Sequence, residues 1–164
     1  MGKEIKIEII RRHVHLCDEH FMMLFGLRRE LNKEKDLVST SSILAKEKVA
    51  IKADNGVTIE NMDIIGPLAK ETKVVVSLTD ALYLNMNIPL RDMNHLENTP
   101  GIMLKGPYGE IRIKRDVIIA RRHVHMSEEE AKELGLKDGD LVSLKTEGER
   151  SVIFQNVIVY VGKK

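Results

Sequence analysis

Hydrophobic and polar residues alternate with a period of two along much of this chain, which is typical of strands with one buried face. The first alternating stretch, Glu4–Ile10, puts three isoleucines on one face and leads directly into a histidine-rich motif. Short apolar runs rich in valine and isoleucine predict further strands. These are Lys48–Lys52, Val57–Ile65, Lys73–Leu78, Ile102–Lys105, Glu110–Lys114, Asp116–His125, Leu141–Lys145 and Val152–Val161.

Turn-forming residues separate these runs. Asp54-Asn55-Gly56 predicts a tight hairpin, because Asn-Gly tolerates the positive φ that such a turn requires. Gly106-Pro107-Tyr108-Gly109 predicts a second hairpin, and Asp138-Gly139 and Glu147-Gly148 turn the chain before the last two strands. The charged, irregular stretch Arg28–Asp36 predicts a loop.

Three short helices are predicted among the strands. The first begins at Asp18 and stops at Gly26, and one or two helical turns cover Thr79–Leu84. Ser127 and Glu130 have the spacing of a capping box at the start of the third helix. Strands dominate and do not alternate regularly with helices, so the sequence predicts a mostly β, barrel-type protein rather than a βαβ fold.

Composition excludes several classes of protein. With 26 basic and 25 acidic residues the net charge is +1, which gives no electrostatic footprint for nucleic acid. Aromatic residues make up 4% and Trp is absent, which argues against a stacking platform for bases. No apolar run approaches the roughly 20 residues that span a bilayer. With a lone Cys17 and no signal-peptide pattern, we predict a cytoplasmic protein without membrane contact.

One pentapeptide occurs twice. Arg11-Arg12-His13-Val14-His15 recurs unchanged as Arg121-Arg122-His123-Val124-His125, and each copy follows an apolar stretch and precedes a short helix. The repeat predicts a duplicated half-barrel. On a strand, His-Val-His places both imidazoles on one face, where they form a two-point clamp for a divalent metal, most commonly zinc. The alternative is a duplicated structural strand with buried, hydrogen-bonded histidines.

The residues next to the first histidine pair are each open to a functional and a structural interpretation. Cys17 continues the alternation of the first histidine pair and is either a soft ligand or, as we favour, a small buried filler. His20 is expected to be structural or exposed. Arg11 should point with the pair and Arg12 away from it, and each is able either to receive an anion or to form a salt bridge.

A catalytic zinc usually has three protein ligands and one open position. The segment Ile88–Gly101 offers Asp92, His95 and Glu97 as further ligands. It also offers Arg91, whose planar guanidinium suits phosphate. The alternative is a solvated loop with ordinary charges.

The chain resembles the PduL-type phosphotransacylases (phosphate propanoyltransferases) from its first strand to about Val161. This resemblance implies two small β-barrels capped by short α-helices, with residues 1–11 and 121–164 in one and 12–120 in the other. It also implies conversion of a short-chain acyl-CoA and inorganic phosphate to acyl phosphate and CoA. The motifs that carry it are Arg12-His13-Val14-His15-Leu16, Pro89-Leu90-Arg91-Asp92, Pro100-Gly101, Arg122-His123-Val124-His125-Met126 and Gly135-Leu136-Lys137-Asp138-Gly139-Asp140.

The resemblance also implies site residues. One zinc would be held by the first histidine pair with Glu97, with Arg91 as the phosphate ligand, and CoA would contact Lys35. A second zinc would be held by His123 and His125 with a further C-terminal histidine. That histidine has no counterpart up to Lys164, so the expected number of zinc ions is one or two. The first predicted strand begins almost at Met1, so we expect no microcompartment-targeting extension.

Three functional hypotheses follow. The first is direct, metal-assisted acyl transfer, because no Ser-His-Asp arrangement is evident and Cys17 is the only thiol. The second is a non-catalytic barrel that binds zinc and CoA. The third is a DNA-binding or assembly module, since residues 135–141 resemble the helix-turn-strand of swapped barrels. In each case a homodimer is expected to cover open strand edges.

Overall fold

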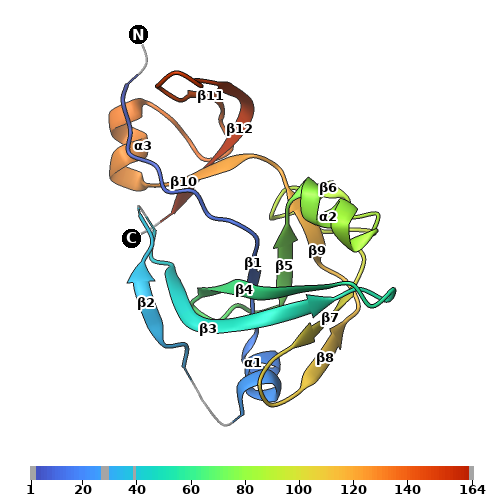
Figure 1. Ribbon diagram of the computed structural model, residues 1–164. Helices are drawn as coiled ribbons and strands as arrows, with labels where there is room; N and C mark the ends of the chain where they lie inside the picture. Colours follow the sequence, from blue (N-terminus) through green and yellow to red (C-terminus); the bar gives the residue numbers. More distant parts are fainter. Residues whose placement is uncertain (1–2, 27–29, 39, 163–164) are drawn as a thin grey trace. The chain divides into compact units, whose positions relative to one another are not determined.

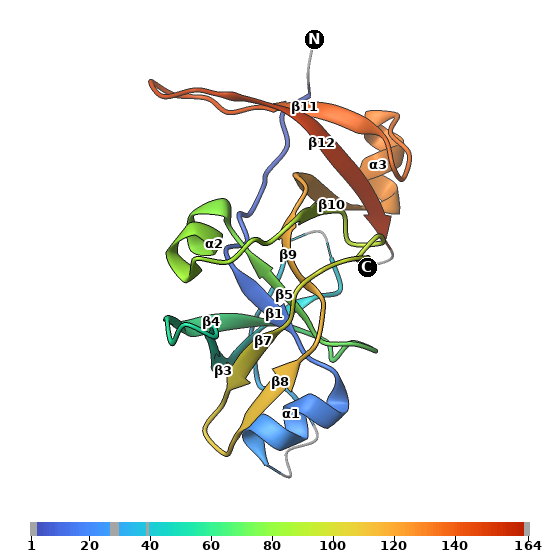
Figure 2. The same cartoon turned by 90° about the vertical axis from the view of Figure 1, so that its right-hand side faces the viewer.

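A computed structural model describes residues 3–26, 30–38 and 40–162 of the protein. Within those residues the fold is mostly β, as predicted, with twelve strands and three short helices (Figures 1 and 2). No described helix has both the length and the apolar character needed to cross a bilayer. The elements are β1 (His13–His15), α1 (Asp18–Phe25), β2 (Lys33–Asp36), β3 (Ile43–Lys52), β4 (Thr58–Gly66), β5 (Lys73–Val76), α2 (Leu78–Leu84), β6 (Leu90–Arg91), β7 (Ile102–Lys105), β8 (Glu110–Ile113), β9 (Val117–Ala120), β10 (His123–Ser127), α3 (Glu128–Leu134), β11 (Leu141–Lys145) and β12 (Ile153–Gly162).

The chain divides into two compact units. The large unit comprises Ile9–Asp36 and Ser42–Ala120, and the small unit comprises Met1–Glu8, Leu37–Ser41 and Arg121–Lys164. Each unit has its own sheet, with nine strands in the large unit and three in the small one. The two histidine motifs therefore fall in different units.

The first histidine motif occupies the middle of the large unit's sheet. The strand order is β6-β9-β5-β1-β4-β3-β7-β8, and β2 pairs with β3 outside that path. The three-residue strand β1 runs parallel to β4 and antiparallel to β5, and Figure 1 shows it between them in the curled sheet. Its backbone is thus hydrogen-bonded on both sides by strands that come much later in the chain.

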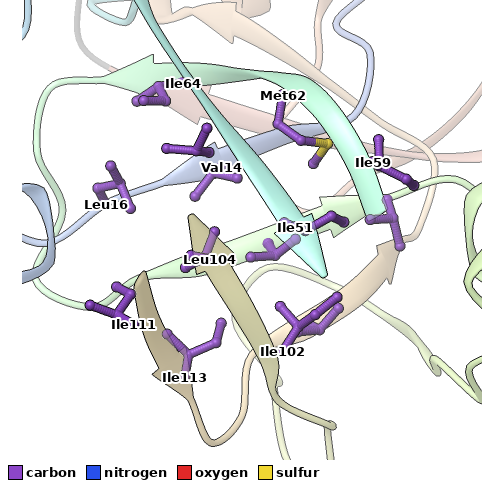
Figure 3. Packing of buried hydrophobic residues seen from close by; sticks show 14 of the residues in the cluster. Val14, Leu16, Ile51, Ile59, Met62, Ile64, Ile102, Leu104, Ile111 and Ile113 are labelled. Carbon is purple, nitrogen blue, oxygen red and sulfur yellow. The ribbon is translucent and has the colours of Figure 1, made fainter. Parts of the chain in front are cut away.

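Aliphatic side chains fill the inside of this curled sheet. Val14 and Leu16, which flank His15 in the sequence, are fully buried in the core. Figure 3 shows the side chains from β1, β3, β4, β7 and β8 that gather there. Since neighbouring strand residues face opposite ways, burying Val14 turns His13 and His15 away from the core. The other labelled residues in that view are Ile51, Ile59, Met62, Ile64, Ile102, Leu104, Ile111 and Ile113.

The small unit contains a three-stranded sheet in the order β10-β12-β11. β10 runs parallel to β12, and β11 pairs antiparallel with β12. Helix α3 packs on one face of this sheet, where Met126, Ala131 and Val159 form a small buried cluster. The other face of β10 carries the second histidine pair.

Most local predictions are confirmed. The Asp54-Asn55-Gly56 turn joins β3 and β4, with Gly56 at φ +87°. Gly26 ends α1 at φ +81°. The Ser127–Glu130 capping box is present with both of its reciprocal hydrogen bonds. These signals act over only a few residues, so their outcome does not depend on the rest of the chain.

The strand predicted over Glu4–Ile10 is wrong, because no strand is formed by these residues. Their isoleucines are partly exposed, and Ile9 retains 83% of its accessible surface. Alternation indicates which side chains could share a face, but a strand also requires a hydrogen-bonded partner. The extended segment from Lys3 to Ile10 has no such partner among the described residues.

Two other predictions needed correction. The loop predicted over Arg28–Asp36 includes strand β2, although Arg28 and Arg29 lie outside the described residues. β2 is a fully exposed edge strand of charged residues, a sequence that discourages further edge pairing. The single strand predicted over Asp116–His125 is two strands, β9 and β10, because the chain passes from the large unit to the small one between Ala120 and Arg121.

Candidate functional site

His13 and His15 lie side by side on the face of β1 opposite the core. Their ring centroids are 5.0 Å apart and the ring planes are nearly perpendicular, at 86°. Val14 between them is fully buried and fixes the orientation of the strand. The shared face predicted for this pair is confirmed.

A backbone contact orients the first ring of the pair. Nδ1 of His13 lies 2.7 Å from the carbonyl oxygen of Arg11. A carbonyl oxygen only accepts, so Nδ1 carries the proton of the neutral ring and Nε2 is the basic nitrogen. Such an Nδ1–H contact is the usual outer support of a metal-binding histidine.

The second pair repeats this arrangement in the small unit. The ring centroids of His123 and His125 are 5.0 Å apart with the planes at 87°. Nδ1 of His123 lies 2.7 Å from the carbonyl oxygen of Arg121. Identical sequences thus adopt the same local geometry in two separate sheets.

The duplication extends well beyond the pentapeptide. Each histidine strand runs parallel to the second strand of a hairpin: β1 to β4 of the β3–β4 hairpin, and β10 to β12 of the β11–β12 hairpin. Both hairpins contain register shifts, and the strand beside the histidine strand carries a left-handed asparagine at one of them, Asn61 on β4 or Asn156 on β12, both at φ 55°. The two histidine pairs therefore belong to equivalent structural modules.

The two arginines of the first motif form ion pairs with carboxylates from two different elements. Nη2 of Arg11 lies 3.6 Å from Asp63, the residue paired with His13 on β4. Nη1 of Arg12 lies 2.6 Å from Oδ1 of Asp80, which is buried at the start of α2. The other oxygen of Asp80 accepts from the backbone N–H of Ser77 in a capping box. Of the two interpretations of these arginines, the structure supports salt bridges.

Replacing Arg12 by Met should lower the free energy of unfolding by about 2 kcal/mol. The change keeps an apolar stem of similar length but leaves the buried Asp80 carboxylate without its cation. The expected loss is moderate because the Arg12 side chain is 42% exposed to solvent. Urea unfolding followed by circular dichroism measures it. The control is Arg112→Met, which breaks the exposed pair with Asp54; equal shifts in both variants would contradict the assignment.

In the second motif, an aromatic ring takes the place of the carboxylate partner. The guanidinium carbon of Arg122 lies 5.9 Å from the centroid of the Phe154 ring, within cation–π range. The carbonyl oxygen of Arg122 accepts the backbone N–H of Ile158 on β12. These contacts anchor the start of β10 to the neighbouring strand.

Arg91 differs from the other described arginines of the large unit. Arg11, Arg12, Arg112 and Arg115 each pair with a carboxylate. Arg91 instead donates from Nε to the carbonyl oxygen of Glu97 and from Nη1 to that of Leu90, both at 3.0 Å. In the described part of that unit it is the only arginine whose charge no acidic side chain compensates. Its guanidinium is therefore oriented by backbone but electrostatically available to an anion.

The loop after Arg91 is organised by Asp92. Oδ1 of Asp92 accepts the N–H of Asn94, and both of its oxygens contact Nδ1 of His95. Burial tends to raise the pKa of Asp92, but these hydrogen bonds and the attraction to His95 outweigh it and lower the pKa below its ordinary value. Asp92 is thus a structural anion of the loop, and its oxygens are occupied by neighbours.

The structure does not assemble a complete set of metal ligands. Among residues 3–26, 30–38 and 40–162, no three His, Cys, Asp or Glu side chains are close enough together to hold an ion. Glu97 is exposed and its loop is linked to Arg91 through its backbone. Lys35 is exposed on edge strand β2. Their predicted roles stay predictions.

Cys17 and His20 share a threonine. The Thr72 hydroxyl accepts the backbone N–H of Cys17 at 3.0 Å, donates to its sulfur at 3.4 Å and lies 2.8 Å from Nδ1 of His20. Thr72 is buried and immediately precedes β5, so the cluster ties the start of α1 to the start of β5. This arrangement supports structural roles for both residues.

Three residues near the histidine pairs escaped prediction. Asp63 and Asp80 hold the motif arginines, and the Tyr160 ring lies 5.3 and 5.5 Å from the rings of His123 and His125. For Asp80, the sequence offers one signal, its capping-box spacing from Ser77. That spacing indicates the start of a helix and does not indicate a partner for an arginine. The register of the parallel strand pairs, which places Asp63 and Tyr160, cannot be read from the sequence.

A family model and several relatives that match this sequence all carry the same description. The sequence model of the family described as phosphate propanoyltransferase matches residues 6–164. A phosphate propanoyltransferase of Thermotoga maritima is 42% identical over 158 residues, covering 96% of this chain and 75% of that protein. One from Lachnoclostridium phytofermentans is 39% identical over 160 residues, covering 98% and 75%. One from Rhodopseudomonas palustris is 34% identical over 160 residues, covering 98% and 70%.

The match spans both units and both histidine motifs, so it does not depend on one shared segment. The family model covers the described residues from Lys6 onward. The chain belongs to the phosphate propanoyltransferase family of acyltransferase enzymes.

Proposed function

We propose that the protein transfers a short-chain acyl group, propanoyl or acetyl, between coenzyme A and inorganic phosphate. Membership of the family and the names of its relatives support the reaction class. The observation that carries the proposal is Arg91, whose guanidinium is oriented by two backbone carbonyls without a compensating carboxylate among the described residues. Phosphate is the substrate that such a planar, forked cation would bind.

The histidine pairs fit a divalent metal by their donor chemistry. Two imidazoles share each strand face, and a backbone carbonyl supports Nδ1 of the first ring in each pair. We propose that His13 and His15, with Glu97, hold zinc, and that His123 and His125 hold a second ion. Bound zinc would supply Lewis acidity toward the thioester and the departing thiolate.

Side chains of this protein are proposed to bind the two substrates. Arg91 would hold phosphate and offset its charge while an oxygen of phosphate attacks the acyl carbon. The carbon–sulfur bond to CoA breaks as the carbon–oxygen bond forms, so the transfer needs no nucleophile from the protein. Lys35, exposed on β2, is proposed to contact the CoA phosphates. We also propose that each unit forms a small helix-capped barrel, which the duplicated strand pairing supports, and that two chains associate to cover open strand edges.

The proposal is tested by following release of the CoA thiol from propanoyl-CoA or acetyl-CoA with zinc-loaded protein. Release should require phosphate and should yield one acyl phosphate for each thiol. Thiol release without phosphate dependence would indicate simple hydrolysis. No release with either thioester would instead favour the non-catalytic barrel that binds zinc and CoA.

Arg91→Ala should lower kcat/KM for phosphate by about a hundredfold, since a charge-assisted contact to the reacting anion is lost. Metal content should be unchanged, because Arg91 is not among the proposed ligands. Arg91→Lys should recover only part of the activity, because an ammonium lacks the planar fork. Arg112→Ala, which removes an exposed arginine paired with Asp54, is the matched control. An unchanged phosphate dependence in Arg91→Ala would remove Arg91 from the site.

A further inference from the structure

The two equivalent modules surround their histidine pairs with different neighbours. His13 is paired with Asp63 on β4, whereas the equivalent His123 is paired with Ile158 on β12. On the next strand, Lys48 opposes Asp63, whereas Leu141 opposes Ile158. The duplicated backbone therefore carries a charged row in the large unit and an apolar row in the small one.

In the large unit, the charged row is internally satisfied. Nζ of Lys48 lies 2.9 Å from Asp63 and 3.6 Å from Glu34, and Arg11 also approaches Asp63. These ion pairs lie beside His13 in the same row of the sheet. The equivalent row beside His123 is apolar, because its partner on β12 is Ile158 and the partner of Ile158 on β11 is Leu141.

The small unit offers an aromatic ring instead. Tyr160 is paired with His125 in the parallel register of β10 and β12, so its side chain leaves the sheet on the same face. Its ring centroid lies 5.3 Å from that of His123 at 55°, and 5.5 Å from that of His125 at 35°. With the 5.0 Å separation of the imidazoles, the three rings form a compact triangle. The equivalent position beside His15, by continuation of the register on β4, is the aliphatic Ile65.

The backbone of Tyr160 is firmly placed. Val159 before it is fully buried in the cluster under α3, and the β10–β12 ladder continues on both sides to Ile158 and Val161. A tyrosine has only two side-chain torsions, so a fixed backbone leaves its ring little freedom. A ring held in this way limits the torsions open to both imidazoles.

We propose that Tyr160 is a positioning residue for the His123–His125 pair, and that its ring holds both imidazoles in a metal-binding orientation. The proposal rests on the proposed function in one respect, that this pair binds a divalent metal. The ring contacts carry the argument and the hydroxyl does not. Phe should therefore substitute for Tyr160, whereas an aliphatic side chain should not.

The test isolates the second pair in a His13→Asn/His15→Asn background and measures zinc affinity by competition with a chromophoric chelator. Tyr160→Phe should bind zinc within about twofold of the background protein, and Tyr160→Leu should bind about tenfold more weakly. Tyr83→Leu, at an exposed position on α2, is the matched control and should have no effect. Cobalt(II) absorption of the same variants reports whether the ligand geometry changes with the ring.

Equal affinity in the Leu and Tyr proteins would overturn the proposal, because the ring would then be dispensable. Phe as weak as Leu would also overturn it, because the hydroxyl and not the ring would matter. No zinc binding by the background protein would overturn it as well. The proposed acyl transfer is tested separately, by thiol release and by Arg91 variants that keep His13 and His15, so the two failures are distinguishable.

Discussion

Replacing His13 and His15 together by Asn should reduce thiol release from propanoyl-CoA by about a thousandfold. The two imidazoles share one face of β1. No described Cys, Asp or Glu is close enough to complete a group of three metal ligands with them, so no such group would remain to hold the ion after both are replaced. Asn is smaller than His but polar, and both positions lie outside the core, so the fold should persist. Metal content by elemental analysis should fall by one ion per chain.

His20→Asn is the control for this double variant. His20 lies on α1 with its ring against Thr72. The substitution therefore removes an imidazole from the same unit and leaves the His13–His15 pair unchanged. Its metal content and its turnover should match those of the unaltered protein. If the double variant kept its full metal content, the first pair would have no role as ligands.

Replacing Gly101 by Ala should lower the free energy of unfolding by about 3 kcal/mol or more. A Cβ atom at this position would lie 2.0 Å from the carbonyl oxygen of Ile113 and within 2.8 Å of backbone atoms of Lys114. These are backbone atoms at the end of β8, so no side-chain rotation relieves the clash. The strand pair β7–β8 would have to move apart, although it closes one side of the core.

Gly162→Ala is the matched control, because Gly162 has no positive φ and a Cβ atom built there would meet no atom of a non-adjacent described residue within 4 Å. Urea unfolding followed by far-ultraviolet circular dichroism suits this chain, which has no Trp for fluorescence. Gly162→Ala should unfold at the same urea concentration as the unaltered protein. An unchanged midpoint for Gly101→Ala would show that the two segments can separate without cost.

Local signals in the sequence predicted much of the secondary structure. Asn55-Gly56 specified a hairpin, and the Ser127–Glu130 spacing specified a helix start, because each motif satisfies its own backbone within a few residues. The alternation of His13, Val14 and His15 likewise determined that the imidazoles share a face once the segment is a strand. The repeated pentapeptide likewise predicted two such pairs.

The same kind of signal failed where a partner was required. Glu4–Ile10 alternates as clearly as any stretch of the chain, but no described strand pairs with it, so its isoleucines remain partly exposed. Lys33–Asp36 has a poor strand sequence yet forms β2, because the edge of β3 offers hydrogen bonds. Strand formation depends on non-local hydrogen bonds, and local pattern does not report them.

By itself, then, the sequence determined the turns, the helix starts, the two imidazole pairs and the resemblance to the phosphate propanoyltransferases. Only the tertiary structure decided which charges are compensated, because Asp63 and Asp80 reach Arg11 and Arg12 from about 50 and 70 residues away along the chain. It also left Arg91 without a carboxylate among the described residues and set the Tyr160 ring against the second pair. The reason is physical: side chains distant in sequence meet only through strand pairing and core packing, whose register depends on the whole fold.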